Sequence, residues 1–104
     1  MNEIRAKDNA VEIVIFEPIE AGFARRIRDQ LEGAKPREIR LHINRPGGSV
    51  SEASAAYGVI TRHPAKVNVH IDGVAASAAS FLAMAGDTVT MAETALMMVH
   101  NPWV

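Results

Sequence analysis

The sequence contains no cysteine. This absence excludes disulfide bonds, thiol nucleophiles and cysteine-based metal sites. An excess of charge of one sign is also lacking, because 11 Lys and Arg face 12 Asp and Glu and leave a formal net charge of −1. A chain this close to neutrality is a poor candidate for binding nucleic acid through bulk charge.

Long hydrophobic runs are missing as well. The longest apolar stretch, from Val74 to Ala85, is interrupted by serines, and a membrane-spanning helix needs about 20 apolar residues. The first ten residues, MNEIRAKDNA, are polar and have no apolar core of the kind that a signal peptide needs. We therefore expect a soluble, cytoplasmic protein.

Five segments have the composition or alternation typical of β-strands. They are residues 11–16, 39–43, 67–71, 87–91 and 95–99. We expect Asp72-Gly73 to end the third of these strands. The last segment, ALMMV, is apolar throughout, which fits a strand that is buried on both faces.

Helical patterns fill the intervals between the first four strands. Apolar residues recur every four positions from Ile19 to Leu31, with Pro18 suited to the first turn and Gly33 to the end. Ser49 and Glu52 have capping-box spacing and predict the start of a second helix. Small residues from Ser77 onward predict a third.

Strands that alternate with helices imply an α/β fold with largely parallel strand pairing. The sequence has no internal repeat, low-complexity tract or linker, so residues 1–104 are interpreted as one domain. The chain stops at Asn101-Pro102-Trp103-Val104, directly after an apolar strand. We therefore expect a domain that is truncated at its C-terminus.

The segment from Gly73 to Ser80, GVAASAAS, carries the first candidate for chemistry. Ser77 stands where a helix is predicted to begin, beside backbone N–H groups without helical partners. These groups favour negative charge, including the oxyanion of an acyl transfer. On spacing alone, a helix N-cap is the more frequent role for such a serine.

Two further candidates are weak individually. The turn Pro46-Gly47-Gly48 follows a strand and could present N–H groups to an oxyanion, although a tight turn explains its glycines equally well. His100 closes the apolar strand and could act as a general base. The other histidines, His42, His63 and His70, lie at polar strand positions or in a loop and fit a solvated surface. Scattered His, Asp and Glu without ligand spacing predict no metal site.

Together these motifs appear in a familiar order: INRPGGSV, then EASAAYGVI, DGVAASAASFLAMAG and ALMMVHNPW. This series resembles the Clp protease proteolytic subunit family, the ClpP-like serine peptidases. It looks closest to the phage and prophage branch, whose members act as head maturation (prohead) proteases. The resemblance covers residues 39–103 and implies the ClpP/crotonase ββα superhelix fold.

Residue by residue, the resemblance implies that Ser77 is the nucleophile and His100 the general base of a serine endopeptidase. The N–H groups of Gly48 and Ala78 would bind the oxyanion. Gly47, Ser49 and Val50 would lie along a peptide or protein substrate, such as a capsid or scaffold protein. The resemblance also implies a ring-type homo-oligomer, a possible ATPase partner, host cytoplasm if a phage encodes the chain, and no cofactor.

The sequence departs from the family pattern after His100. The family's triad ends in an acidic residue well beyond the histidine, and only four residues follow His100 here. Loss of the orienting carboxylate costs about four orders of magnitude in kcat in a related triad, so a complete chain of this length should be feeble or inactive. Two alternatives therefore stay open: an inactive prophage assembly subunit and, less favoured, a crotonase-type acyl-CoA enzyme.

Overall fold

A computed structural model of the chain describes residues 2–45 and 48–98. Six strands in these ranges form one sheet with the order β1-β2-β3-β4-β5, and β6 pairs with β4 off this path. The β1–β2 pair is antiparallel and every other pair is parallel. The elements are β1 (Glu3–Lys7), β2 (Ala10–Ile15), α1 (Phe23–Ala34), β3 (Glu38–Arg45), α2 (Val50–Arg62), β4 (Lys66–Ala76), α3 (Ala78–Ala83), β5 (Thr88–Met91) and β6 (Leu96–Met98).

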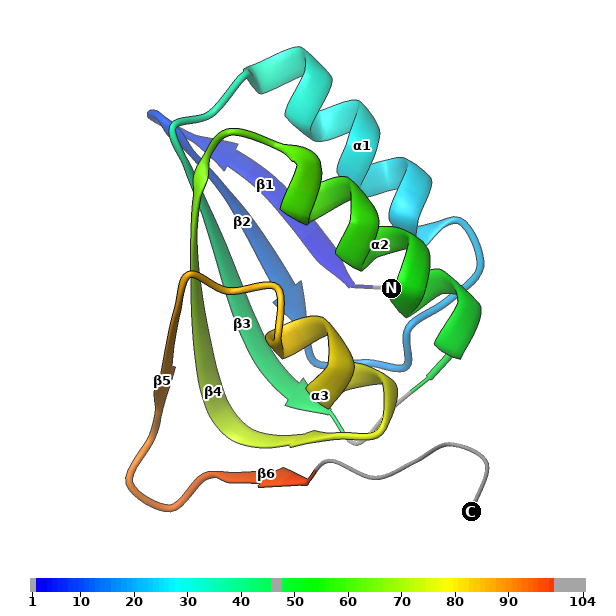
Figure 1. Cartoon of the computed structure of the whole chain (residues 1–104), viewed down its shortest axis with the longest axis vertical. Helices are drawn as coiled ribbons and strands as arrows, with labels where there is room; N and C mark the ends of the chain where they lie inside the picture. Colours follow the sequence, from blue (N-terminus) through cyan, green and yellow to red (C-terminus); the bar gives the residue numbers. More distant parts are fainter. Residues whose placement is uncertain (1, 46–47, 99–104) are drawn as a thin grey trace.

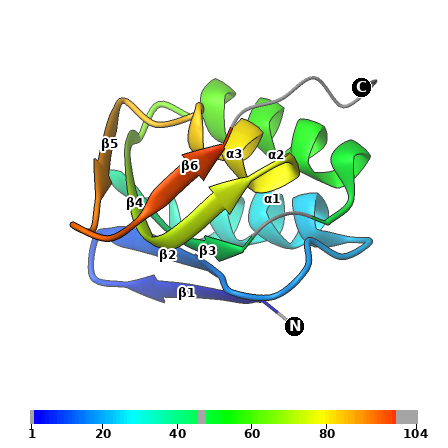
Figure 2. The same cartoon turned by 90° about the horizontal axis from the view of Figure 1, so that it is seen from below.

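The three helices lie on one face of the sheet (Figure 2). Alternate residues of the central strands point at them, and Ile13, Leu41 and Ile71 are fully buried there. Phe23 and Ile27 of α1 enter the same core. Complete burial of a side chain of this size contributes about 1.5–3 kcal/mol, so the predicted alternation of strand residues is what fixes the register of the sheet.

β1 was not predicted from the sequence. It pairs with β2 through a two-residue turn at Asp8 and Asn9, and Lys7 lies opposite Ala10. Asp8 has a φ of 55°, a conformation that Asp tolerates better than most residues. Because β1 is an edge strand with mostly exposed side chains, it has no apolar alternation from which to predict it.

α1 begins later than predicted. Pro18 and Ile19 lie in the loop that follows β2, and the helix starts at Phe23 after Gly22. Ile19 is nevertheless 2% exposed, because the loop folds onto the core. Its spacing from Phe23 matched a helical stripe by coincidence, and the expected helix start at Pro18 is therefore wrong. The helix ends at Ala34, one residue beyond the expected Gly33, and its C-cap is Lys35, with a φ of 47°.

β4 does not end at Asp72-Gly73, as the sequence suggested, but bends there and continues to Ala76 (Figure 1). At the bend the Val74 N–H donates to the side-chain Oδ1 of Asn44, 3.1 Å away, in β3. A Cβ added to Gly73 would lie 2.4 Å from that oxygen. Glycine therefore permits the bend by letting a side-chain amide approach where the β3–β4 register shifts.

β6 pairs with the part of β4 beyond the bend. The prediction that both faces of this strand are buried is wrong, because Leu96 is 60% exposed while Ala95 and Met97 are partly buried. No side chain from the described part of the chain covers Leu96 enough to bury it.

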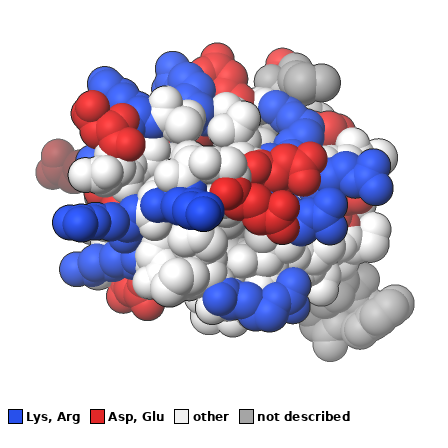
Figure 3. Space-filling model, turned by 90° about the horizontal axis from the view of Figure 1, so that it is seen from above, with Lys and Arg blue, Asp and Glu red and all other residues white. Residues whose placement is uncertain are grey.

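Positive and negative side chains alternate over the face seen in Figure 3, which agrees with the near-neutral charge balance. No helix within residues 2–45 and 48–98 is long and apolar enough to cross a membrane.

Only one of the two hydrogen bonds of the capping box predicted for α2 is present. Ser49 Oγ accepts the Glu52 N–H at 3.2 Å, but the Glu52 carboxylate does not return to the Ser49 N–H. It accepts the Ala24 N–H at 3.0 Å instead, at the start of α1. The N–H groups of Ala24 and then Gly22 hold the pKa of the Glu52 carboxyl below its usual range. Since α1 has no acidic residue in its own first turn, Glu52 of α2 supplies the negative charge there.

Replacing Glu52 with Gln keeps an acceptor but removes the charge. The pKa of Glu52 is lowered in the folded state, so its stabilising contribution exists above the unfolded pKa and is lost as pH falls through the folded pKa. We expect Glu52→Gln to lower the melting temperature at pH 7, and the deficit to shrink as the pH falls below 4.5. Melting curves against pH check this, with the exposed Glu93 replaced by Gln as a control. A deficit that is constant with pH would contradict the capping charge.

Candidate active site

The carboxyl ends of β3, β4 and β6 meet at one edge of the sheet. Arg45 of β3 lies opposite Ala75 of β4, and Ala75 and Ala76 lie opposite Met97 and Met98 of β6. Because all three strands run in the same direction, their last residues lie at the same end of the sheet. Sites in open parallel sheets commonly form at such an edge.

Ser77 occupies the sharp turn between β4 and α3. Its φ of 52° and ψ of −126° are rare for a residue with a side chain, and such backbone conformations cost about 1–3 kcal/mol. Ser77 occupies the N-cap position of α3, as its spacing suggested, but its side chain makes no capping hydrogen bond to the helix. A strained strand-to-helix turn that presents an uncapped hydroxyl is the geometry of a nucleophile in acyl-transfer enzymes.

The strained turn is held by contacts of the Ser77 carbonyl. This oxygen accepts the Phe81 N–H at 3.1 Å and the Ser80 hydroxyl at 2.7 Å. Ser80 is 2% exposed, and the neighbouring Ala78 and Ala79 are buried in the core. The small side chains after Ser77 therefore let α3 pack tightly under the turn, which fixes the direction in which Ser77 leaves the backbone.

Gly48 follows β3 at the same edge. It forms a parallel bridge with Ile19, and the Ser49 N–H donates to the Ile19 carbonyl at 2.9 Å. The φ of Gly48 is 145°, and an added Cβ would lie 2.2 Å from the Ile19 nitrogen. Glycine is therefore required at this position by both conformation and close approach, which the sequence alone could not distinguish from an ordinary tight turn.

Ser49 and Val50 begin α2. The Ser49 N–H is engaged by Ile19 and its carbonyl accepts the Ala53 N–H at 3.0 Å, so its backbone groups serve the fold. Val50 is 51% exposed and presents an apolar side chain beside Gly48 and Ser49, which together form the glycine loop. Their predicted contact with a substrate remains a prediction.

His100 and Gly47, the predicted base and one predicted substrate-binding residue, lie outside the described residues. The described chain ends at Met98, opposite Ala76, which is the residue before Ser77. In the sequence, His100 is two positions beyond Met98.

Two other histidines pair with carboxylates on the sheet face opposite the helices. His42 Nε2 lies 3.4 Å from Glu12, and His70 Nε2 lies 3.4 Å from Asp72. The Asp87 carboxylate, at the other end of the sheet, accepts the Val67 N–H at 2.7 Å. Asp72 is thus paired with His70, and Asp87 with a backbone N–H of β4. Within residues 2–45 and 48–98, no three His, Asp or Glu side chains come together as a metal site.

The fold has close structural counterparts. Over 93% of this chain and 46% of the other, it matches an enoyl-CoA hydratase from Mycobacterium avium subsp. paratuberculosis with a TM-score of 0.76 and 20% identity. A putative enoyl-CoA hydratase/isomerase family protein from Hyphomonas neptunium gives 0.77 and 17%, covering 94% and 49%. A putative enoyl-CoA hydratase from Streptomyces coelicolor A3(2) gives 0.74 and 16%, covering 92% and 46%.

These likenesses define the class of fold, the crotonase/ClpP-like α/β fold, as expected from the resemblance. At such low identity they show the fold alone, and the chain spans about half the length of these proteins. The family is shown separately, because the Clp protease family matches residues 3–104. This chain belongs to the Clp protease family, which confirms the family inferred from the motifs.

Replacing Gly48 with Ala should distort the glycine loop. The new Cβ would clash with the Ile19 backbone and force a strained φ, so we expect a loss of about 1–3 kcal/mol in the free energy of unfolding. Gly33→Ala is the matched control, because a Cβ there meets nothing within 4 Å and alanine stabilises a helix interior by about 0.5–1 kcal/mol. Urea unfolding measures both variants. Equal stability of the two would contradict the close Gly48–Ile19 approach.

Proposed function

We propose that this chain carries the active centre of a ClpP-like serine endopeptidase, with Ser77 as nucleophile and His100 as general base. The observation that carries the proposal is the strained turn at Ser77, whose hydroxyl caps nothing, in a chain that belongs to the Clp protease family. Membership supports peptidase chemistry at the level of the family. The roles of individual residues are the proposal.

In the proposed reaction, His100 takes the proton of the Ser77 hydroxyl as Oγ attacks the scissile carbonyl carbon. The carbonyl oxygen becomes an oxyanion, which the N–H groups of Gly48 and Ala78 stabilise. Protonated His100 then gives its proton to the leaving amine as the C–N bond breaks, and an acyl-Ser77 ester remains. Water, deprotonated by His100, hydrolyses the ester and restores both residues.

Two features of the described chain support the oxyanion donors. Ala78 is the first residue of α3, where backbone N–H groups have no acceptor within the helix. Gly48 lies at the same sheet edge, three residues beyond the Arg45–Ala75 pair. One donor of this kind is worth about 2.7–4 kcal/mol in the transition state.

The biological setting that we propose is processing of capsid or scaffold protein by a phage or prophage head maturation protease. It rests on the likeness of INRPGGSV, DGVAASAAS and MMVHNPW to that branch. An ATPase partner is not required by the proposed chemistry, and neither is a cofactor.

The enoyl-CoA hydratases that share the fold raise acyl-CoA chemistry as the alternative. That chemistry commonly uses a glutamate, and Glu52 is the glutamate nearest the glycine loop in sequence. Its carboxylate is taken up by the start of α1, which leaves it poorly suited to act as a base. An inactive assembly subunit remains the other alternative, and the labelling experiment below separates it from the peptidase.

A fluorophosphonate probe tests the proposal, because it reacts with an activated serine and leaves a stable adduct. We expect labelling of the full chain that Ser77→Ala abolishes and that Ser54→Ala, an exposed serine of α2, leaves intact. His100→Ala should slow labelling by at least about 10²-fold, the lower range for general-base catalysis. Labelling that persists in Ser77→Ala would reject Ser77 as the nucleophile, and no labelling of the parent chain would favour the inactive subunit.

We also propose that the chain self-associates, as the family resemblance implies. Several large apolar side chains are exposed on α3, at its C-cap and on strands β5 and β6, namely Phe81, Met84, Val89, Met91 and Leu96. Apolar surface of this kind is commonly covered by another subunit.

Met84 is 60% exposed, so Met84→Glu should leave the fold of a single chain intact while placing a charge on this surface. We expect a lower mass at equal concentration by light scattering, with an unchanged melting temperature at low concentration. The exposed Lys66, replaced by Gln, controls for the change of one unit in net charge. Equal masses for parent and Met84→Glu would exclude the surface around Met84 from the contact.

A further inference from the structure

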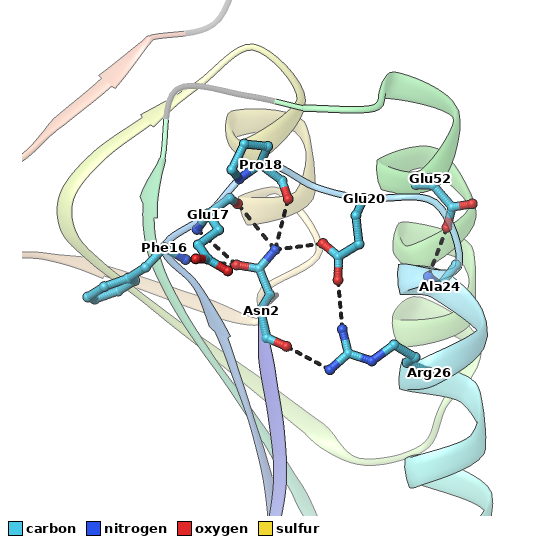
Figure 4. Close-up of polar contacts among 8 residues, drawn as sticks. All are labelled: Asn2, Phe16, Glu17, Pro18, Glu20, Ala24, Arg26 and Glu52. Carbon is cyan, nitrogen blue, oxygen red and sulfur yellow. Dashed lines mark hydrogen bonds and ion pairs between the residues drawn. The ribbon is translucent and has the colours of Figure 1, made fainter.

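The Asn2 side chain is one of the few buried polar groups in the described chain, at 3% exposure. Its Oδ1 accepts two backbone N–H groups, those of Phe16 at 3.1 Å and Glu17 at 2.9 Å. Its Nδ2 donates to the carbonyls of Glu17 and Pro18, both at 3.2 Å, and to the Glu20 carboxylate at 2.9 Å. Both Oδ1 and Nδ2 of this amide therefore form hydrogen bonds with one short segment, residues 16–20 (Figure 4).

A second contact joins this network to α1. Arg26 donates to Glu20 Oε1 at 2.7 Å and to the Asn2 carbonyl at 2.6 Å. Residues 16–20 form neither a helix nor a strand, and Ile19 alone among them pairs with another segment, through an isolated β-bridge. The conformation of the segment therefore depends on Asn2, Glu20 and Arg26 rather than on a backbone ladder.

The same segment supports the glycine loop. Ile19 is the backbone partner of Gly48 and accepts the Ser49 N–H, and its nitrogen is so close that Gly48 tolerates no Cβ. The far side of the loop is tied by Ser49 Oγ to the Glu52 N–H, and by the Glu52 carboxylate to the Ala24 N–H. The position of Gly48 is thus set by contacts that lead back, through Ile19, to Asn2.

We propose that Asn2 is a positioning residue for the oxyanion donor at Gly48, acting through the 16–20 segment and Ile19. The catalytic part of this inference rests on the proposed peptidase function. Asn2 touches no reacting atom in it. Its amide holds Ile19 where the Gly48 N–H is aimed, and loss of the amide frees the segment, and with it the donor, to shift. Donor geometry matters because removing one oxyanion donor lowers kcat by about 10²–10³-fold.

A matched amide exists elsewhere in the sheet. Asn68 of β4 donates to Glu38 at 2.6 Å and accepts the Thr88 hydroxyl at 2.6 Å. It too uses both ends of its side chain, but its partners lie on β3 and β5, near the amino ends of the strands and away from Gly48. Asn68→Ala therefore removes the same kind of group without touching the glycine loop.

The experiment compares Asn2→Ala with Asn68→Ala in the full chain by two measurements. The first is hydrogen exchange of the Ser49 amide, which reports the Ser49–Ile19 hydrogen bond without any catalysis. The second is the fluorophosphonate labelling of Ser77, separated into probe affinity and the rate constant of the bonding step. In Asn2→Ala we expect Ser49 exchange to accelerate by at least tenfold relative to Asn68→Ala (an order-of-magnitude figure for one lost hydrogen bond). The bonding step should slow while probe affinity is kept.

A charge-swapped pair guards against simple misfolding. Asn2→Asp keeps the acceptor for the Phe16 and Glu17 N–H groups but sets a carboxylate against Glu20. Adding Glu20→Gln restores a donor to that contact and still leaves an acceptor for Arg26. We expect the double variant Asn2→Asp/Glu20→Gln to recover part of the Ser49 protection and labelling that Asn2→Asp alone loses, because its carboxylate still faces the Glu17 and Pro18 carbonyls. No recovery at all would contradict the role of the Asn2–Glu20 contact.

The outcomes separate this inference from the proposed function. If the parent chain is labelled and Asn2→Ala changes Ser49 exchange and labelling no more than Asn68→Ala does, the positioning role is overturned and the peptidase stands. If the parent is never labelled, the catalytic part is overturned, and accelerated Ser49 exchange in Asn2→Ala then supports only the link from Asn2 to the loop.

Discussion

The parallel pairing of β3 with β4 is the constraint on which the rest of the structure depends. The two strands stay in register from Glu38 and Lys66 to Ile43 and Ile71, and they pair again at Arg45 and Ala75 after a shift. Across that shift a side-chain oxygen of Asn44 takes the place of a ladder carbonyl. Because both strands end at the same edge, Gly48 and Ser77 each follow one of two adjacent, paired strands.

The two loops at this edge are fixed in different ways. Ser77 is held from within its own element, by α3 packing beneath it and by two hydrogen bonds to its carbonyl. Gly48 is held from outside, by Ile19 and by contacts that run to Asn2 and to α1. A strained backbone conformation persists only where surrounding contacts stabilise it. At Ser77 these contacts come from its buried neighbours, which fix the course of the chain.

Polar side chains do more to position the loops at this edge of the sheet than the apolar sequence pattern suggests. Asn2, Asn44 and Glu52 each satisfy backbone N–H groups of another element, with one such contact per residue at least. A buried N–H left without an acceptor costs about 1–3 kcal/mol, so these side chains decide where loops lie although they add little to the core. The core itself is ordinary: strand residues on one face and three helices over them.

The sequence by itself determined the central strands, the family and the identity of the candidate nucleophile. Alternation at 39–43 and 67–71 is local, and local spacing specifies it. The motif around Ser77 pointed to a nucleophile only through its resemblance to a family. The sequence did not specify β1, because an exposed edge strand needs no apolar period. The sequence also did not specify that β4 continues past Gly73, because the bend at Gly73 depends on Asn44 of another strand. Tertiary structure alone decided that the Ser77 hydroxyl makes no capping bond, that Ile19 belongs to a loop, and that Glu52 serves α1 rather than its own helix. For Ile19 and Glu52 the physical reason is that the hydrogen-bond partner is many residues away in the chain, where a pattern of neighbours cannot reveal it. For Ser77 the reason is the backbone conformation of the strand-to-helix turn, which local spacing does not specify.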